Sequence, residues 1–383
     1  MTNDSRDATS NPSVPFRADP EGTGDTRPAW LEDLLASIEP ASPSHRAAAA
    51  TRHGQLTKPA GSLGRLEDLG VQLAAIQRRE RPRAERARVV IFAADHGVAR
   101  DEGVSAFPCE VTGQMVANFA AGGAAVNALA SSAGAELEVL DLGVAHPILT
   151  PEVRDRVRRF SLMAGTENFR RSPAMSRPQL EMALRIGIEA ARRCAEDGIE
   201  VAAVGEMGIG NTSAASALTA CLTGEAVADV TGPGTGLEDA GLRRKIAVLE
   251  DAIALHRGRE LPPLELLRCL GGLEIAGLVG FFLGVAATRT ICVNDGFICT
   301  AALAVAARVC PSVGDYVVAA HRSAEPGHRI LLAALGLEPL LSLDMRLGEG
   351  SGAALALPLV RAAARVLDEM HTFADAGVSE RDA

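Results

Sequence analysis

The chain has 383 residues, of which 47% are hydrophobic and 22% are charged, and its formal net charge is -10. This length and composition are typical of a soluble globular protein with one large α/β domain and a smaller unit, or with two domains. The acidic balance, the single Trp and the single Tyr argue against a nucleic-acid partner, which needs a basic face and aromatic platforms. Backbone N–H groups could still bind a small anion.

The N-terminal segment and the cysteines indicate a cytoplasmic protein. Residues 1–28 are polar and rich in Asp, Arg and Pro, so we expect a disordered tail and no signal peptide. Gly, Arg and Glu interrupt the Ala-rich segments before they reach the ~20 apolar residues of a membrane span, so no membrane partner is expected. The seven cysteines are scattered without a CxxC pair, which predicts reduced core thiols.

Hydrophobic periodicity predicts the elements in chain order. Helical spacing of apolar residues is present over 30–38 and 66–79, and from residue 88 onward β-branched runs alternate with Ala/Leu-rich helical patterns. Strands are predicted at 88–94, 136–142, 200–205, 289–294 and 315–320. Helices are predicted at 111–133, 176–197, 211–222, 238–256, 297–309 and 325–336. This alternation predicts an α/β fold, a parallel sheet with helices on both faces.

In such a sheet, ligands bind outside the carboxyl ends of the strands, so the loops there are candidate sites. Asp95 and His96 follow the first strand, either as a turn with a capping Asp or as a pocket wall. The next residues mix flat apolar surface with a few polar groups: Ser105, Phe107, Pro108, Gln114 and Met115. A planar organic ligand would need such a wall.

Two Gly-rich loops each lead into a predicted helix. The first is "GEMGIGNTS" at 205–213, with Asn211 or Thr212 as the expected N-cap, and the second is "TGPGTGL" at 231–237. Glycines allow close approach of a ligand, and a helix N-terminus favours an anion, although a purely structural turn would look the same. Pro233 offers no N–H donor to a phosphate. Lys245 is either the cation of this site or part of a solvated charge run.

Other polar residues follow the later strands. Asp295 ends one strand, and Ser323 fits either an N-cap or a phosphate contact. His321 and His328 match no usual zinc spacing, so no metal is expected. Glu349 stands between two glycines before an apolar helix. It is either an acid favoured by the helix dipole or a general base whose carboxylate is desolvated by apolar neighbours.

Together the motifs resemble the nicotinate-nucleotide:dimethylbenzimidazole phosphoribosyltransferase family, which assembles the lower ligand of cobalamin. The matching stretches lie in family order over residues 58–378: "KPAGSLGRLEDL", "FAADHGV", "GVSAFPCEVTGQM", "GTENF" with "SPAM", "GEMGIGNTS", "GTGL", "GGLEIAGLVG", "DGFICTAAL", "HRSAEPGH", "MRLGEGSGAALALPLVRAA" and "FADAGVS". The resemblance implies transfer of 5-phosphoribose from nicotinate mononucleotide to 5,6-dimethylbenzimidazole, with Glu349 as the catalytic base.

The resemblance also implies the roles of other residues. The wall that binds the base would contain Ser105, Gln114, Met115 and Leu347. The phosphate and ribose site would contain Glu206, Gly208, Asn211, Gly234, Thr235, Gly236, Lys245, Asp295 and Ser323. The donor carries one phosphate and a pyridinium leaving group already activated by its charge, so no metal and no cofactor are expected. Which lower-ligand base is preferred stays open.

Family architecture implies a homodimer with a Rossmann-like large domain at 86–339. A small helical domain would be built from 29–85 together with 340–383, and the tail at 1–28 lies outside the resemblance. Two rival functions are weighed against this one. A non-catalytic nucleotide-binding protein of the same fold is disfavoured by the intact "LGEGSGA" motif, and a nicotinamide-dependent oxidoreductase by the lack of a dinucleotide fingerprint.

Overall fold

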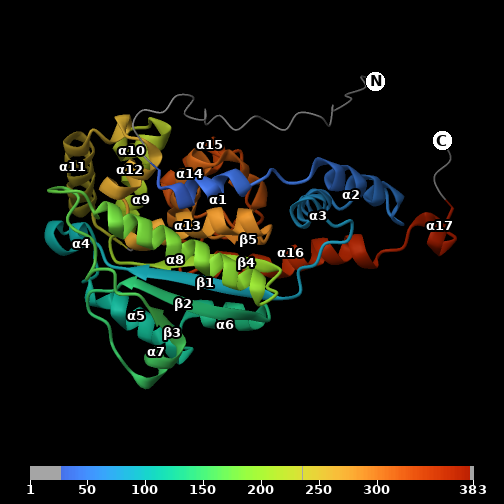
Figure 1. Ribbon diagram of the computed structural model, residues 1–383, viewed down its shortest axis with the longest axis horizontal. Coiled ribbons are helices and arrows are strands. Elements are labelled where there is room, and N and C mark those ends of the chain that lie inside the picture. Colours follow the sequence, from blue (N-terminus) through green and yellow to red (C-terminus); the bar gives the residue numbers. More distant parts are fainter. Residues whose placement is uncertain (1–26, 235, 380–383) are drawn as a thin grey trace.

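A six-stranded parallel sheet forms the centre of the protein (Figure 1). The computed structural model describes residues 27–234 and 236–379, so almost all of the predicted tail at 1–28 lies outside the described residues. The strands are β1 (Ala87–Ala94), β2 (Ala135–Gly143), β3 (Val157–Arg159), β4 (Val201–Met207), β5 (Ile291–Asn294) and β6 (Val317–Ala319). Their order, β3-β2-β1-β4-β5-β6, is that of a Rossmann fold and confirms the predicted class.

Helices surround the sheet and continue beyond one end of it. They are α1 (Ala29–Ser37), α2 (Pro43–Gln55), α3 (Arg65–Gln77), α4 (Gly97–Glu102), α5 (Glu110–Ala121), α6 (Ala125–Ser132), α7 (Pro151–Arg156), α8 (Arg177–Glu196), α9 (Asn211–Thr223), α10 (Val227–Val230), α11 (Asp239–His256), α12 (Pro263–Leu270), α13 (Leu273–Thr288), α14 (Phe297–Val309), α15 (Pro326–Ala334), α16 (Ser351–Glu369) and α17 (Phe373–Ala376). Across the described residues, no helix combines the length and apolar character needed to cross a membrane.

The two faces of the sheet bury different helices. On one face, Phe92 of β1 meets Phe281 of α13 edge to face, with ring centroids 5.7 Å apart. On the other face, α6 contacts β2, and α16 contacts β1, β4 and β5. Because both faces are covered, the residues of β1 are buried almost without interruption, as its continuous apolar sequence predicts.

Helices α8 and α13 approach each other unusually closely. A Cβ atom on Gly187 would lie 1.9 Å from the carbonyl oxygen of Gly277, and one on Gly280 would lie 2.1 Å from that of Leu184. Real Cβ atoms never come so near to a backbone oxygen, so these positions need glycine. The two backbones therefore touch directly, without a layer of side chains between them.

Several elements differ from the sequence predictions. The predicted helix at 111–133 is broken into α5 and α6, because Gly122 adopts a left-handed conformation (φ 84°) and ends α5. The strand β3 and the helices α4, α7, α10, α12 and α13 were not predicted. α13 is apolar on all sides because it is buried on all sides, so it shows no helical period of polar residues.

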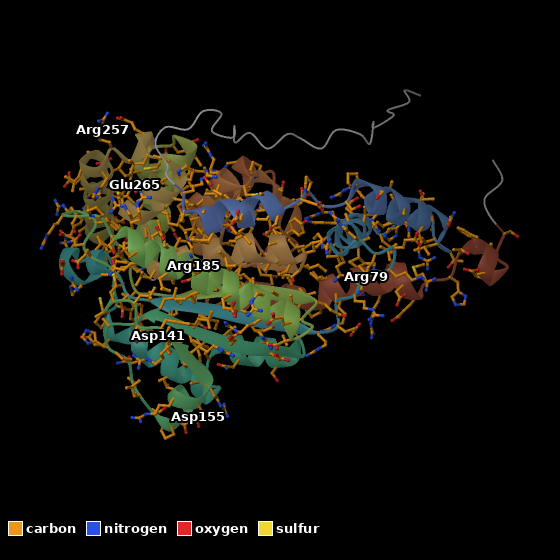
Figure 2. All side chains as sticks on the ribbon, in the orientation of Figure 1. Arg79, Asp141, Asp155, Arg185, Arg257 and Glu265 are labelled. Carbon is orange, nitrogen blue, oxygen red and sulfur yellow. The ribbon has the colours of Figure 1, made fainter. Side chains whose placement is uncertain are left out.

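The helices α2 and α3 meet the C-terminal helix α16 beside the sheet, on the right of Figure 1. α2, α3 and the end of α16 share a small apolar cluster of Ala49, Ala74 and Leu367. α1 packs instead on α13. The guanidinium of Arg185 on α8 lies 4.0 Å from the ring centroid of Trp30 (Figure 2). The proposed division into 29–85 with 340–383 and 86–339 stays a prediction, and α1 contacts the larger part.

Candidate active site

The strand order runs from β1 to β3 toward one edge of the sheet and from β4 to β6 toward the other. A hollow lies at this switch point, between the carboxyl ends of β1 and β4. The space between its walls is about 300 Å³, part of which is open to solvent. Its lining residues are Val104, Ser105, Gly208, Ile209, Gly210, Asn211, Thr212, Pro233, Gly234 and Lys245. The fold thus brings five predicted site residues, Ser105, Gly208, Asn211, Gly234 and Lys245, into one hollow at the expected edge of the sheet.

The first Gly-rich loop reaches this edge because it packs directly on β1. A Cβ atom on Gly208 would lie 2.3 Å from the carbonyl oxygen of Ala94. The residue that caps α9 is Gly210, in a left-handed conformation (φ 95°), so the predicted N-cap at Asn211 or Thr212 is wrong. The side chain of Asn211 instead donates a hydrogen bond to Glu206.

Lys245 is a fully buried cation in the hollow. Its Nζ donates to Thr212 Oγ1 at 2.9 Å and to the carbonyl oxygen of Gly232 at 3.3 Å. Burial lowers the pKa of Lys245 to about 8, and the charge of Glu325 partly opposes this shift. Arg243 and Arg244 on the same helix are exposed to solvent. Of the three consecutive basic residues, therefore, only Lys245 points into the hollow.

The second Gly-rich loop contributes its backbone to the hollow. Gly234 is left-handed (φ 58°), and a Cβ atom there would lie 3.3 Å from Thr212 Oγ1 and 3.7 Å from Lys245 Nζ. Pro233 accepts hydrogen bonds from the N–H groups of Gly236 and Leu237, at 3.2 and 3.0 Å. Gly236 is exposed, and Thr235 lies outside the described residues.

Glu206 links the hollow to the loop of Glu349. Burial raises the pKa of Glu206 to about 8, and the neighbouring charges of Asp295, Glu274 and Glu349 act in the same direction. A Cβ atom on Gly348 would lie 2.5 Å from Glu206 Oε1, so the carboxyl group lies directly beneath that glycine. At neutral pH Glu206 is therefore largely protonated and adds little negative charge beside Glu349.

Glu349 lies in an uncommon backbone conformation. Gly348 (φ 82°), Glu349 (φ 64°) and Gly350 (φ 84°) are three consecutive left-handed residues, and such a conformation costs a residue with a side chain about 1–3 kcal/mol. Helix α16 begins only at Ser351, so Glu349 precedes its first turn. Glu349 is 6% exposed, and its Oε2 atom is buried without a hydrogen-bond partner.

The surroundings of Glu349 suit a general base. Burial raises the pKa of Glu349, and the charge of Asp295 acts in the same direction. The N–H of Val126, in the first turn of α6, opposes this shift by hydrogen bonding to the carboxylate. Glu349 is thus a desolvated carboxylate with one free oxygen, which is the chemistry of a proton acceptor.

Asp295 lies on the far side of the same loop. Its two carboxylate oxygens accept hydrogen bonds from the N–H groups of Gly350, at 3.2 Å, and of Ala353, at 2.9 Å. Asp295 is 1% exposed. Its predicted contact with phosphate or ribose stays a prediction, but the carboxylate already serves the N-terminus of α16.

His328 fixes the backbone next to Ser323. The N–H of Ser323 donates to His328 Nδ1 at 2.9 Å, so His328 Nε2 carries the proton that it shares with Thr300 Oγ1, also at 2.9 Å. Burial lowers the pKa of His328 to about 3, so the ring is neutral. Ser323 is buried but does not cap α15, whose N-cap is Glu325. Among the described residues no group of His, Cys, Asp and Glu could hold a metal ion.

Comparison with known proteins gives consistent matches over nearly the whole chain. A family model described as "Phosphoribosyltransferase" matches residues 38–378. A nicotinate-nucleotide–dimethylbenzimidazole phosphoribosyltransferase of Chloroflexus aggregans is 51% identical, over 92% of this chain and 98% of that protein. The enzyme of the same name from Azotobacter vinelandii is 53% identical, over 90% of this chain and 97% of that protein. The crystal structure of the Thermus thermophilus enzyme superposes with a TM-score of 0.82 at 46% identity, over 89% of this chain and 100% of that one.

This chain belongs to the nicotinate-nucleotide–dimethylbenzimidazole phosphoribosyltransferase family. The resemblance inferred from the ordered motifs is thereby confirmed.

The residues that the family resemblance assigns to the base wall are not all gathered here. Ser105 lines the hollow, whereas Gln114, Met115 and Leu347 are not among its lining residues. Met115 is half-buried, Gln114 is exposed and Leu347 is 54% exposed. Their part in binding the base stays a prediction.

One buried pair behind the family's first Gly-rich loop was not predicted. His96 Nε2 lies 2.6 Å from Glu274 Oε1, and neither side chain is exposed. Burial alone would lower the pKa of His96, but Glu274 raises it above its ordinary value. A lone acid in the apolar sequence of α13 was the available signal, because a buried carboxylate needs a partner.

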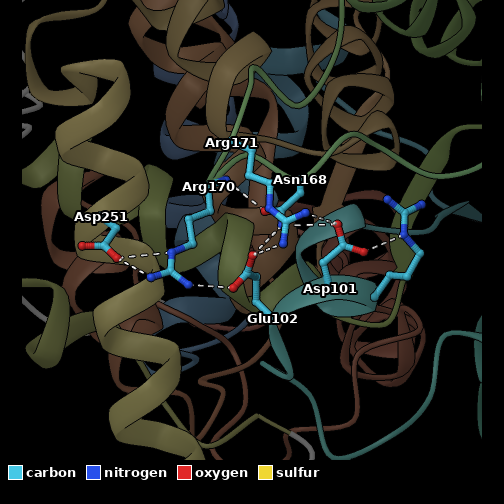
Figure 3. A network of polar contacts seen from close by, with 7 residues as sticks. Asp101, Glu102, Asn168, Arg170, Arg171 and Asp251 are labelled. Carbon is cyan, nitrogen blue, oxygen red and sulfur yellow. Dashed lines mark hydrogen bonds and ion pairs between the residues drawn. The ribbon is translucent and has the colours of Figure 1, made fainter.

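A polar network ties α11, which carries Lys245, to α4, the helix that follows β1 (Figure 3). Arg170 donates to Glu102 of α4 and to Asp251 of α11, both at 2.7 Å. Asn168 adds a hydrogen bond to Glu102, also at 2.7 Å. Asn168 belongs to the "GTENF" motif of the family, and Arg170 follows that motif directly. Together they connect α4 with α11.

Proposed function

We propose that this protein transfers 5-phosphoribose from nicotinate mononucleotide to 5,6-dimethylbenzimidazole, giving α-ribazole 5′-phosphate and nicotinate, with Glu349 as the general base. The names of relatives about half identical over nearly the whole chain support the reaction. The observation that carries the role of Glu349 is its buried, unpartnered Oε2 atom on a left-handed loop beside the hollow.

The hollow suits the phosphoribosyl end of the donor. Lys245 supplies a positive charge, and the first turn of α9 presents backbone N–H groups, which together favour a phosphate. Gly208 and Gly234 let the donor approach the backbone closely. In this arrangement the anomeric carbon would face Glu206 and Glu349, which lie next to the hollow.

The proposed chemistry moves one proton. A ring nitrogen of dimethylbenzimidazole attacks the anomeric carbon opposite the nicotinate, the new C–N bond forms, and the old one breaks. Its electron pair neutralises the pyridinium, so the leaving group needs no acid. The N–H proton of the benzimidazole passes to Glu349. General-base catalysis contributes ~10²–10⁴-fold, and positioning of both substrates about 7–11 kcal/mol.

The substitution Glu349→Gln tests this assignment. It keeps the shape of the side chain but removes the proton acceptor, so we expect kcat to fall by about 10²–10⁴-fold. Formation of α-ribazole phosphate, followed by chromatography, measures the rate. The wild-type kcat should rise with pH through the raised pKa of Glu349, because only the ionised carboxylate accepts a proton.

Two outcomes would contradict the proposal. Near-normal turnover of Glu349→Gln would remove Glu349 as the base. Binding of nicotinate mononucleotide by the wild-type protein without any product would favour the rival function, a non-catalytic nucleotide-binding protein of the same fold. Glu152→Gln, a change of an exposed acid on α7 that is not among the predicted site residues, is a suitable control.

The same proposal includes a homodimer in the cytoplasm that acts on these two small molecules without a metal or cofactor. The family resemblance supports the dimer. All seven cysteines are free, which supports a reducing compartment. A panel of benzimidazoles, adenine and phenolic bases with product identification would establish the preferred acceptor.

A further inference from the structure

Asp295 joins the end of β5 to the loop that presents Glu349. One of its carboxylate oxygens accepts from the N–H of Gly350, the residue after Glu349. The other accepts from the N–H of Ala353, in the first turn of α16. Each such charge-assisted bond is stronger than one between neutral groups, and here both lie out of contact with water.

The loop of Glu349 needs an anchor because its conformation is intrinsically unfavourable. Glu349 is a left-handed residue with a side chain, between two left-handed glycines. Its carbonyl oxygen lies against β4, where a Cβ atom on Gly205 would come within 2.4 Å. Without restraint, the chain would relax to a right-handed conformation and turn the Glu349 side chain away.

His321, after β6, completes the anchor. Its Nε2 lies 3.6 Å from Asp295 Oδ1, and the side chains are 2% and 1% exposed. The ring also lies against α16, because a Cβ atom on Gly352 would come within 2.0 Å of His321 Cδ2. Gly205 in β4, Asp295 just after β5 and His321 after β6 thus all contact the start of α16 or the loop before it.

We propose that Asp295 is a positioning residue for the transfer reaction: it fastens the start of α16 to β5, keeps the loop at 348–350 left-handed, and so holds the carboxylate of Glu349 where it accepts the proton. This inference rests on the proposed function. It differs from the role implied by the resemblance, a contact with phosphate or ribose, because both oxygens of Asp295 are engaged with the backbone of α16.

Asp295 also acts on Glu349 through its charge. Burial raises the pKa of Glu349, and the negative charge of Asp295 raises it further. The other groups that face this carboxylate are Glu206 on β4 and the N–H of Val126 in α6. His321 after β6 faces Asp295 instead, where it opposes the rise in the pKa of Asp295 that burial causes. Removing the charge of Asp295 should therefore lower the pKa of Glu349 and shift the acid limb of the pH profile to lower pH.

The substitution Asp295→Asn is the test. Asparagine keeps one acceptor oxygen but turns an NH₂ group toward the other backbone N–H, so one end of the anchor is lost. We expect kcat to fall about 10²-fold, because a misplacement of 1 Å can have that effect. We expect the KM for nicotinate mononucleotide to change less than about threefold, since a positioning residue makes no ground-state contact. A large rise in KM at unchanged kcat would overturn the inference in favour of a ligand contact.

Asp141→Asn is a matched control. Asp141 (labelled in Figure 2) lies two residues before the end of β2, is 1% exposed, and accepts from the N–H of Val144 at 2.8 Å and from Arg159 Nε at 2.9 Å. Neither of these partners belongs to α16. The Asp141→Asn variant should keep the wild-type kcat and the acid limb of the wild-type pH profile. If both variants lost kcat equally and neither moved the acid limb, Asp295 would have only a general structural role and the inference would be overturned.

Hydrogen exchange separates this inference from the proposed base. The amides of residues 350–353 should exchange faster in Asp295→Asn and at the wild-type rate in Glu349→Gln. Unchanged exchange in Asp295→Asn would overturn the anchor, whatever the turnover of Glu349→Gln. Faster exchange in Asp295→Asn together with normal turnover of Glu349→Gln would overturn the proposed base and retain Asp295 as the anchor of α16.

Discussion

Lys245 is a buried cation, and its protonation state should govern the affinity for nicotinate mononucleotide. Desolvation lowers the pKa of Lys245 to about 8, so the free protein loses this charge as the pH rises above that value. A phosphate dianion next to Nζ would raise the pKa again, so binding above pH 8 must be accompanied by uptake of a proton.

We therefore predict that the affinity for nicotinate mononucleotide falls between pH 7 and pH 9. Lys245→Gln should weaken binding at pH 7 by about 10–100-fold, the value of a charge-assisted hydrogen bond, and should flatten this pH dependence. Isothermal titration calorimetry measures both effects. Arg244→Gln removes an exposed charge from the adjacent position of α11 and should bind normally. If Lys245→Gln and Arg244→Gln weakened binding equally, Lys245 would act only through long-range charge, and the predicted contact with phosphate would be wrong.

At the scale of elements, the sequence predicts what depends on local pattern. The five predicted strands are all present, because each combines β-branched residues with bounding turns. β3 has only three residues, "VRR", too few to show a pattern. The Gly-Glu-Gly run signals an unusual turn at Glu349. Its anchor could not be predicted, since the contacts of Asp295 with Gly350 and Ala353 join residues more than 50 positions apart.

The helices at the chain ends share the core of the sheet. Leu31 of α1, Leu73 of α3 and Leu357 of α16 belong to the same contiguous apolar cluster as the strands. We therefore predict one cooperative heat-absorption peak in differential scanning calorimetry, because the terminal helices cannot unfold without exposing that core. Two resolved transitions would instead support an independent small helical domain.

At the scale of the whole molecule, the proposed homodimer must form despite the electrostatic repulsion between two negatively charged chains. Each chain carries a net charge of -10, so two chains repel each other and salt should strengthen their association. Light scattering should give about twice the 39.8 kDa of one chain at 0.15 M salt, since a C2 pair is the commonest assembly. A mass of one chain at every protein concentration would contradict the dimer.

The glycine contact between α8 and α13 decides which parts of this enzyme can move. Two helices whose backbones touch should move as one rigid unit, because no side chain lies between them whose rotamer could change to accommodate a shift. We therefore expect no sliding of α8 against α13, and any opening that admits two substrates in turn must come from the loops at the carboxyl ends of the strands.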